Sequence, residues 1–221
     1  MTVQTLQQAA LYAFGQSPDN ARFSDDLYSA INSAQEEFVN SRKWGFLRTS
    51  GSLTTTDGTR TVALPSNFGS FYDVRGSTVI TSPSANSGGV VQIMTLDEWM
   101  NDNWEDGSSE GTPSYVYVLG DNANFSPIPD AEYVVSIKYY KRPGNIGNTS
   151  DTLTIPNKYS EVLKKMVWLR LIEDGYSSVQ ELEITEDRVQ KLLAKAASDD
   201  VAKYGSFNFN LNSKDYKRST V

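Results

Sequence analysis

Five acidic residues lie close together in this sequence, with two tryptophans between them. The acids are Asp97, Glu98, Asp102, Glu105 and Asp106, and the tryptophans are Trp99 and Trp104. Glycoside hydrolysis uses such a set, because one acid protonates the leaving oxygen, another acts as base or nucleophile, and aromatic rings hold the sugar. Acidic runs are more often the solvated face of a helix or loop, and we favour that interpretation here.

The rest of the composition offers few groups for catalysis. The chain has no histidine and no cysteine, which removes the commonest general base and metal ligand as well as thiolate chemistry. A serine nucleophile would need a lysine base, and no spacing in the chain suggests such a pair. We therefore predict that the protein is not an enzyme and uses no metal or cofactor.

The overall charge limits the partners. The chain has 221 residues, 38% of them hydrophobic, and a net charge of −7. An acidic balance opposes tight wrapping on nucleic acid, because lysine and arginine drive duplex binding. The segment 138–142, Lys-Tyr-Tyr-Lys-Arg, resembles the basic and aromatic mixture of single-strand binders, but its alternation also fits a strand with Tyr139 inward and Lys138 outward. We see no secretory signal and no run of membrane-spanning length, so we expect synthesis in the cytoplasm.

Apolar residues at helical spacing occur at both ends of the chain. Residues 2–14 and a run from the N-cap Ser24 to Lys43 predict two helices. Residues 154–205 predict a helical hairpin whose second helix reaches about 40 Å at 1.5 Å per residue. This is more apolar length than one copy can cover, so we expect neighbouring copies to cover part of it. The predicted interface residues are Val162, Met166, Leu182, Val189 and Leu193.

The middle of the chain, residues 48–152, is typical of antiparallel strands. It is rich in threonine, tyrosine, valine, glycine and proline, in short alternating runs separated by turn signals. The clearest predicted hairpin joins 53–56 to 61–64 through Asp57-Gly58. Further strands are predicted at 71–75, 78–81, 90–94, 115–119 and 133–141, with a short helix at 95–100 and a connection at 122–130.

The predicted fold class is therefore α+β. A helical bundle is formed by residues 1–47 and 153–205, an antiparallel β domain is inserted at 48–152, and an extended arm follows at 206–221. Apolar residues alternate with asparagines in the arm, which suits an extended strand added to the sheet edge of another protein. A frayed terminus is the alternative. The predicted docking residues are Phe207, Phe209, Leu211, Tyr216, Lys217 and Arg218.

This order of elements resembles the head-to-tail adaptors of tailed bacteriophages, and in particular the tail tubular protein A type of short-tailed phages. The similar features are a helix pair ending in Trp44-Gly45-Phe46, Leu64-Pro65 after the first hairpin, Asn-Phe-Ser-Pro-Ile-Pro at 124–129 before a tyrosine-rich strand, and Ile155-Pro156 before a helix. The resemblance implies a ring, usually of twelve copies, in the neck of the virion and assembled in the bacterial host.

In such a ring the portal lies above, the tail nozzle or tail tube lies below, and double-stranded genomic DNA passes through without specific binding. The resemblance places the arm on the portal and the β part toward the tail. We assign Trp99, Trp104, Tyr115 and Tyr117 to the tail-facing surface. The alternative is a carbohydrate- or receptor-binding β module on a helical stalk, in which these four rings would be stacking platforms.

Overall fold

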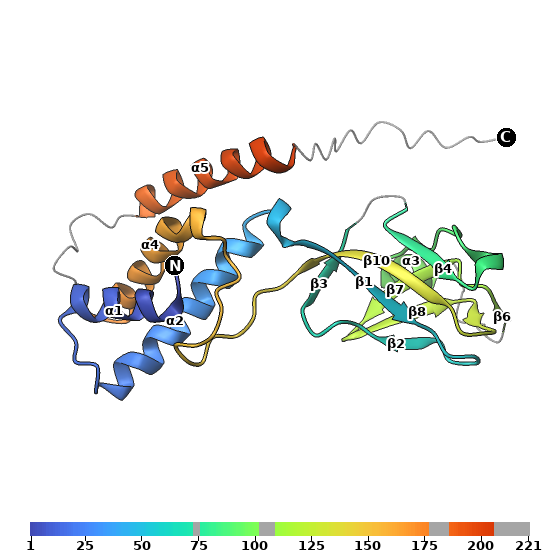
Figure 1. The fold of residues 1–221 in the computed structure, drawn as a ribbon, viewed down its shortest axis with the longest axis horizontal. Helices are drawn as coiled ribbons and strands as arrows, with labels where there is room; N and C mark the ends of the chain where they lie inside the picture. Colours follow the sequence, from blue (N-terminus) through green and yellow to red (C-terminus); the bar gives the residue numbers. More distant parts are fainter. Residues whose placement is uncertain (73–75, 102–108, 177–185, 206–221) are drawn as a thin grey trace.

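The protein consists of a helical part and a β part that meet at a narrow waist (Figure 1). The structure is a computed structural model and describes residues 1–72, 76–101, 109–176 and 186–205. The helical part contains α1 (Val3–Phe14), α2 (Ala21–Asn40), α4 (Ser160–Glu173) and α5 (Glu186–Tyr204). Each part has a hydrophobic core of its own. The class is α+β, as predicted.

Local signals set the ends of the first two helices. The Thr2 hydroxyl accepts a hydrogen bond from the Thr5 N–H, and Gly15, at φ +62°, ends α1 in the left-handed conformation that glycine tolerates. The start of α2 differs from the prediction at Ser24. Asn20 is the N-cap, because its side-chain oxygen accepts from the Phe23 N–H at 3.2 Å.

Helix α4 is the central helix of the helical part. Little of its surface is exposed to solvent. Its buried apolar residues are Val162, Leu163, Met166, Val167, Trp168 and Leu171. Helix α2 packs along α4, α5 covers another side, and the Phe14 ring of α1 meets the Trp168 ring edge-on at 5.7 Å. The chain itself therefore covers most of the apolar length that we expected neighbouring copies to cover.

The chain returns to the helical part soon after it leaves the last strand. The side chain of Asn32 donates to the carbonyl of Ile146 and accepts from its N–H, and the Gln35 side chain accepts from the Thr154 N–H at 3.0 Å. Ile146 is 2% exposed and belongs to the helical core. Residues before Leu153 therefore already pack against the helical core.

The described residues of the β part form two four-stranded sheets, a two-stranded sheet and the short helix α3 (Leu96–Asn101). One sheet has the order β1-β10-β3, with β4 also paired to β10, and the other has the order β2-β8-β7-β5. The strands are β1 (Arg48–Thr54), β2 (Thr61–Ala63), β3 (Phe68–Phe71), β4 (Thr78–Ser82), β5 (Gln92–Ile93), β6 (Glu110–Gly111), β7 (Tyr115–Leu119), β8 (Asn122–Ser126), β9 (Ile128–Pro129) and β10 (Val134–Lys141). Most of the pairings are antiparallel, as predicted, but β5 pairs with β7 and β6 with β9 in parallel.

The predicted hairpin at Asp57-Gly58 forms its turn but not its ladder. The Thr59 N–H donates to the Thr56 carbonyl at 3.0 Å, and Gly58 has φ +68°. Beyond this turn the strands separate into different sheets, since β10 lies beside the whole length of β1 and β2 pairs with β8. The turn is therefore a corner that joins the two sheets.

Strand β8 is the main element that the sequence did not predict. It lies in the segment 122–130, which we interpreted as a connection because of its asparagines and prolines. Gly120, at φ +61°, and Asp121 form the two-residue turn that pairs β8 with β7. Ala123 and Phe125 are fully buried in the β core, so β8 is a structural strand.

Candidate interaction surfaces

Most of the predicted ring-interface residues are core residues of a single chain. Val162, Met166 and Val189 are 5%, 2% and 3% exposed, respectively, and belong to the helical core. Leu193 is half-buried against the same core. Leu182 lies outside the described residues. The first three assignments need correction, because side chains already covered by their own chain have no apolar surface left for a neighbouring copy.

Two of the four predicted tail-facing rings, Trp99 and Tyr117, are buried against each other. Trp99 of α3 stacks on Tyr117 of β7 with the ring centroids 4.5 Å apart. These side chains are only 7% and 4% exposed, so the stack is closed to a ligand. Tyr115 is half-buried, and Trp104 lies outside the described residues. This burial contradicts the idea that Trp99 and Tyr117 hold a sugar.

The acidic cluster contains a helix cap. The Glu98 carboxylate accepts from the Thr95 N–H at 2.8 Å and from the Thr95 hydroxyl at 3.0 Å, while the Glu98 N–H donates to that hydroxyl at 3.2 Å. These bonds lower the pKa of Glu98 below its ordinary value, the reverse of what a general acid requires. Asp97 is exposed on the same helix, and Asp102, Glu105 and Asp106 lie outside the described residues.

A buried carboxylate fixes α5 to the waist. Asp200 is 2% exposed, and its two carboxylate oxygens accept from the Gly45 N–H at 2.8 Å and from the Tyr159 hydroxyl at 3.4 Å. Gly45 belongs to the 3₁₀ turn η1 (Gly45–Leu47) between α2 and β1, and Tyr159 ends the 3₁₀ turn η3 (Asn157–Tyr159) before α4. Asp200 therefore connects three separate segments at one point.

An aromatic cluster surrounds this point. Trp44 is fully buried, stacks on Phe38 at 4.4 Å and donates its indole N–H to the Phe38 carbonyl at 2.7 Å. Phe46 and Tyr159 lie within 6 Å of the Trp44 ring. Trp44 and Phe46 thus fill the seam between the helices and the start of β1. The role of Asp200, on the buried side of α5, was not predicted.

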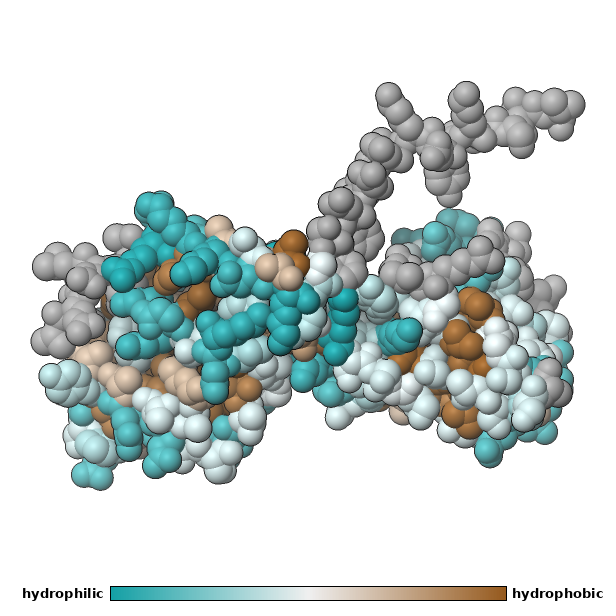
Figure 2. Space-filling model, turned by 45° about the horizontal axis from the view of Figure 1, so that its top comes forward, coloured by the Kyte–Doolittle hydropathy of each residue, from teal (hydrophilic) through white to brown (hydrophobic). Residues whose placement is uncertain are grey.

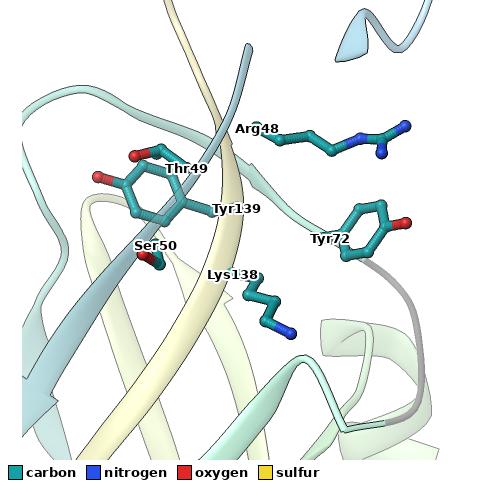
Figure 3. Close-up of a pocket in the computed structure, with 6 residues that line it drawn as sticks. All are labelled: Arg48, Thr49, Ser50, Tyr72, Lys138 and Tyr139. Atoms are coloured by element: carbon teal, nitrogen blue, oxygen red, sulfur yellow. The ribbon is translucent and has the colours of Figure 1, made fainter. Parts of the chain in front are cut away.

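Two recesses open at the waist. The first has a volume of about 250 Å³ and is lined by Arg48, Thr49, Ser50, Tyr72, Lys138 and Tyr139. Figure 3 shows the side chains of Arg48, Tyr72 and Lys138 on one side of the paired strands β1 and β10. The second recess has a volume of about 180 Å³, and its lining includes Arg42, Lys43, Ser70, Tyr140, Lys141 and Arg142.

Buried or hydrogen-bonded tyrosines make the fold sensitive to alkali. Burial raises the pKa of Tyr159 and Tyr140, while hydrogen bonds to Asp26 and Asp130 raise the pKa of Tyr176 and Tyr133, respectively, above the ordinary 10.0. The unfolded chain therefore loses these protons at lower pH than the folded protein. The stabilisation is complete below pH 10.0 and is lost as the pH rises above it.

We expect urea unfolding, followed on both sides of pH 10.0, to show this loss. Tyr176→Phe removes one of the four groups and should make the decline shallower. Tyr12, which is 84% exposed, provides the matched control Tyr12→Phe. Equal slopes for the two variants would contradict the assignment.

These features together describe a protein with two hydrophobic cores and a buried, hydrogen-bonded connection between them. In the described ranges no three acidic, histidine or cysteine side chains gather to hold a metal ion, and no described helix is long and apolar enough to cross a membrane. The chain matches the SU10 adaptor protein family over residues 1–205 and belongs to that family. The family consists of structural phage adaptors, which is not an enzyme class. No curated protein matches the chain.

Proposed function

We propose that the protein forms a homo-oligomeric ring, of twelve copies by resemblance to other adaptors, that joins the portal of a tailed phage to its tail and lets genomic DNA pass. The observation that carries this proposal is the family match, which spans both the helical part and the β part. In this arrangement the β part faces the tail nozzle or tail tube, and residues 206–221 bind the portal.

The contacts at the waist support a role in which the protein holds two partners in a fixed relative position. The Asp200 contacts and the Trp44 cluster hold the helical part, α5 and the first strand together. An adaptor needs such a connection, because a partner bound at one end must keep a fixed relation to a partner bound at the other. The arm would begin at residue 206, directly after the Gly205 that ends α5, close to these contacts.

Ring closure would use exposed polar helix surfaces more than an apolar stripe. Within the described residues, four large apolar side chains are exposed, and they are spread over both parts: Tyr12, Val90, Met100 and Leu119. The outward side of α5 carries charged residues such as Lys191, Lys195 and Asp199. Contacts of this kind are weak singly, so we expect the free chain to remain monomeric and the portal to template the ring.

A mixing experiment tests the adaptor function. The purified chain should sediment with portal rings and add a visible layer beneath them in negative-stain images, whereas the chain alone should sediment as a monomer. A tight dimer in the absence of portal, or no co-sedimentation with the portal encoded by the same phage, would contradict the proposal. A glycan array tests the carbohydrate-binding alternative, which the closed Trp99–Tyr117 stack disfavours.

A further inference from the structure

Five cationic side chains of the described residues gather at the waist of this acidic chain. We call them the basic band: Arg42, Lys43, Lys138, Lys141 and Arg142. They come from the residues after α2, the end of β10 and the residue after it. Figure 2 shows hydrophilic side chains concentrated on the viewed face where the two parts meet. The band is therefore a surface assembled from segments about a hundred residues apart in the sequence.

Neutral groups hold several of these cations in place. The Lys43 ammonium donates to the Ser70 hydroxyl at 2.8 Å and lies 5.1 Å from the centre of the Tyr140 ring. The Arg42 guanidinium donates to the Ala197 carbonyl at 2.9 Å. Rings and hydroxyls fix the positions of these groups but leave their charge uncompensated.

The contrast with other cations of the protein is clear. Arg170 in α4 forms ion pairs with Glu37 and Glu173 at 2.9 and 3.0 Å. In the basic band, Arg142 pairs with Asp121 at 3.3 Å, but both side chains are more than half exposed, so the pair is screened and weak. The three lysines of the band make no ion pair within the described part of the chain. The band thus retains positive charge for an external anion.

We propose that the basic band binds the phosphate backbone of double-stranded DNA, weakly and without regard to sequence. Lysine, arginine and hydroxyl groups are the usual phosphate-binding groups, and contacts of this type carry no sequence information. None of the exposed large apolar side chains lines either recess, whereas a protein partner would normally bury an apolar centre. Repulsion by the acidic remainder confines the attraction to this band.

The inference rests on the proposed function in one respect: the ring is what would bring DNA to the band. In a ring, each copy would present its band at the same height along the channel. A few screened contacts per copy would centre a moving duplex without holding it, because each contact exchanges readily with salt ions. The net charge of −7 makes the rest of the chain repel DNA, so the band would add one attractive zone to the channel.

Fluorescence anisotropy of a labelled duplex, titrated with the purified chain at several low salt concentrations, tests the proposal. The test variant is Lys43→Gln, Lys138→Gln, Lys141→Gln. The control variant Arg22→Gln, Lys191→Gln, Lys195→Gln removes the same charge from the helical surface. We expect the test variant to reduce the slope of log affinity against log salt by about 0.9 for each phosphate that it no longer neutralises, and the control to keep the slope of the unmodified chain.

Each outcome supports or overturns the inference without depending on the ring. No salt-sensitive DNA binding by the unmodified chain, or equal slopes for both variants, would overturn it. If the test variant loses portal binding while its DNA binding is unchanged, the band serves an acidic protein surface, and the DNA proposal is wrong. Failure of the chain to join portal rings while the slopes still differ would contradict the adaptor function alone.

Discussion

Deletion of residues 206–221 should abolish binding to the portal and leave the stability of the remaining chain unchanged. Stability should hold because α5 ends at Tyr204, and the Gly205 N–H already closes the helix by donating to the Val201 carbonyl at 2.8 Å. On α5 the described hydrogen bonds to the waist are made by the Ala197 carbonyl and the Asp200 carboxylate, which the deletion leaves in place. Co-sedimentation with portal rings and the urea midpoint of unfolding measure the two effects.

A matched pair of variants tests whether portal binding depends on the alternating apolar residues of the arm or only on the arm being present. Replacing Phe207, Phe209 and Leu211 with serine removes the apolar side of the alternation, and replacing Asn208, Asn210 and Asn212 with serine changes the other side. Burial of each large apolar side chain contributes about 1.5–3 kcal/mol, so the first variant should bind at least about a hundredfold more weakly. Equal binding by both variants would contradict a docking strand, and retained binding by the deletion would refute the docking arm altogether.

The sequence predicted helix ends well where a local signal acts alone. Gly15, Gly175 and Gly205 all have positive φ and lie just after α1, α4 and α5, respectively, where glycine is the usual end of a helix. The strand at 115–119 and the short helix after Thr95 were also predicted, because alternation and an N-terminal cap are visible in short windows.

The sequence could not predict which strands and helices far apart in the chain pack against each other. The strands on either side of Gly58 have hairpin character, yet β1 pairs with β10, eighty or more residues away, since that ladder extends along its whole length. Periodicity likewise showed which side of residues 160–173 is apolar, but not that α1, α2 and α5 would surround it. That is why Val162 and Met166 were assigned to a ring interface and are core residues instead.

One signal in the sequence could have revealed the site at the waist. Val189, Leu193, Ala196 and Asp200 follow helical spacing, so an acid occupies a position of the apolar side of α5. A carboxylate in such a position must have a hydrogen-bond partner if it is buried. The partner, the Gly45 N–H, could not have been predicted, because the two residues are 155 positions apart.

The close contact at Gly45 leads to the second large expected effect. A Cβ atom on Gly45 would lie 2.4–2.6 Å from Cγ, Cβ and Cδ2 of Tyr204, far inside normal contact. Because Cβ and Cγ sit next to the backbone of α5, a side-chain rotation cannot relieve the clash, and the end of the helix must move. This movement also removes the bond from the Gly45 N–H to the buried Asp200. Overpacking and an unsatisfied buried carboxylate together should make Gly45→Ala about 3 kcal/mol less stable.

A double-mutant cycle shows whether Tyr204 is the cause. Tyr204→Gly removes all three clashing atoms, so in that background Gly45→Ala should cost about 1–2 kcal/mol less than it does in the unmodified chain. Gly144→Ala is the matched control, because its added Cβ has no heavy atom within 4 Å. Hydrogen exchange should show reduced protection in α5 of Gly45→Ala but not of Gly144→Ala. If the arm takes its direction from α5, Gly45→Ala should also weaken portal binding at temperatures where the chain is still folded. Unchanged hydrogen exchange and unchanged portal binding would mean that α5 is not fixed to the waist through Gly45.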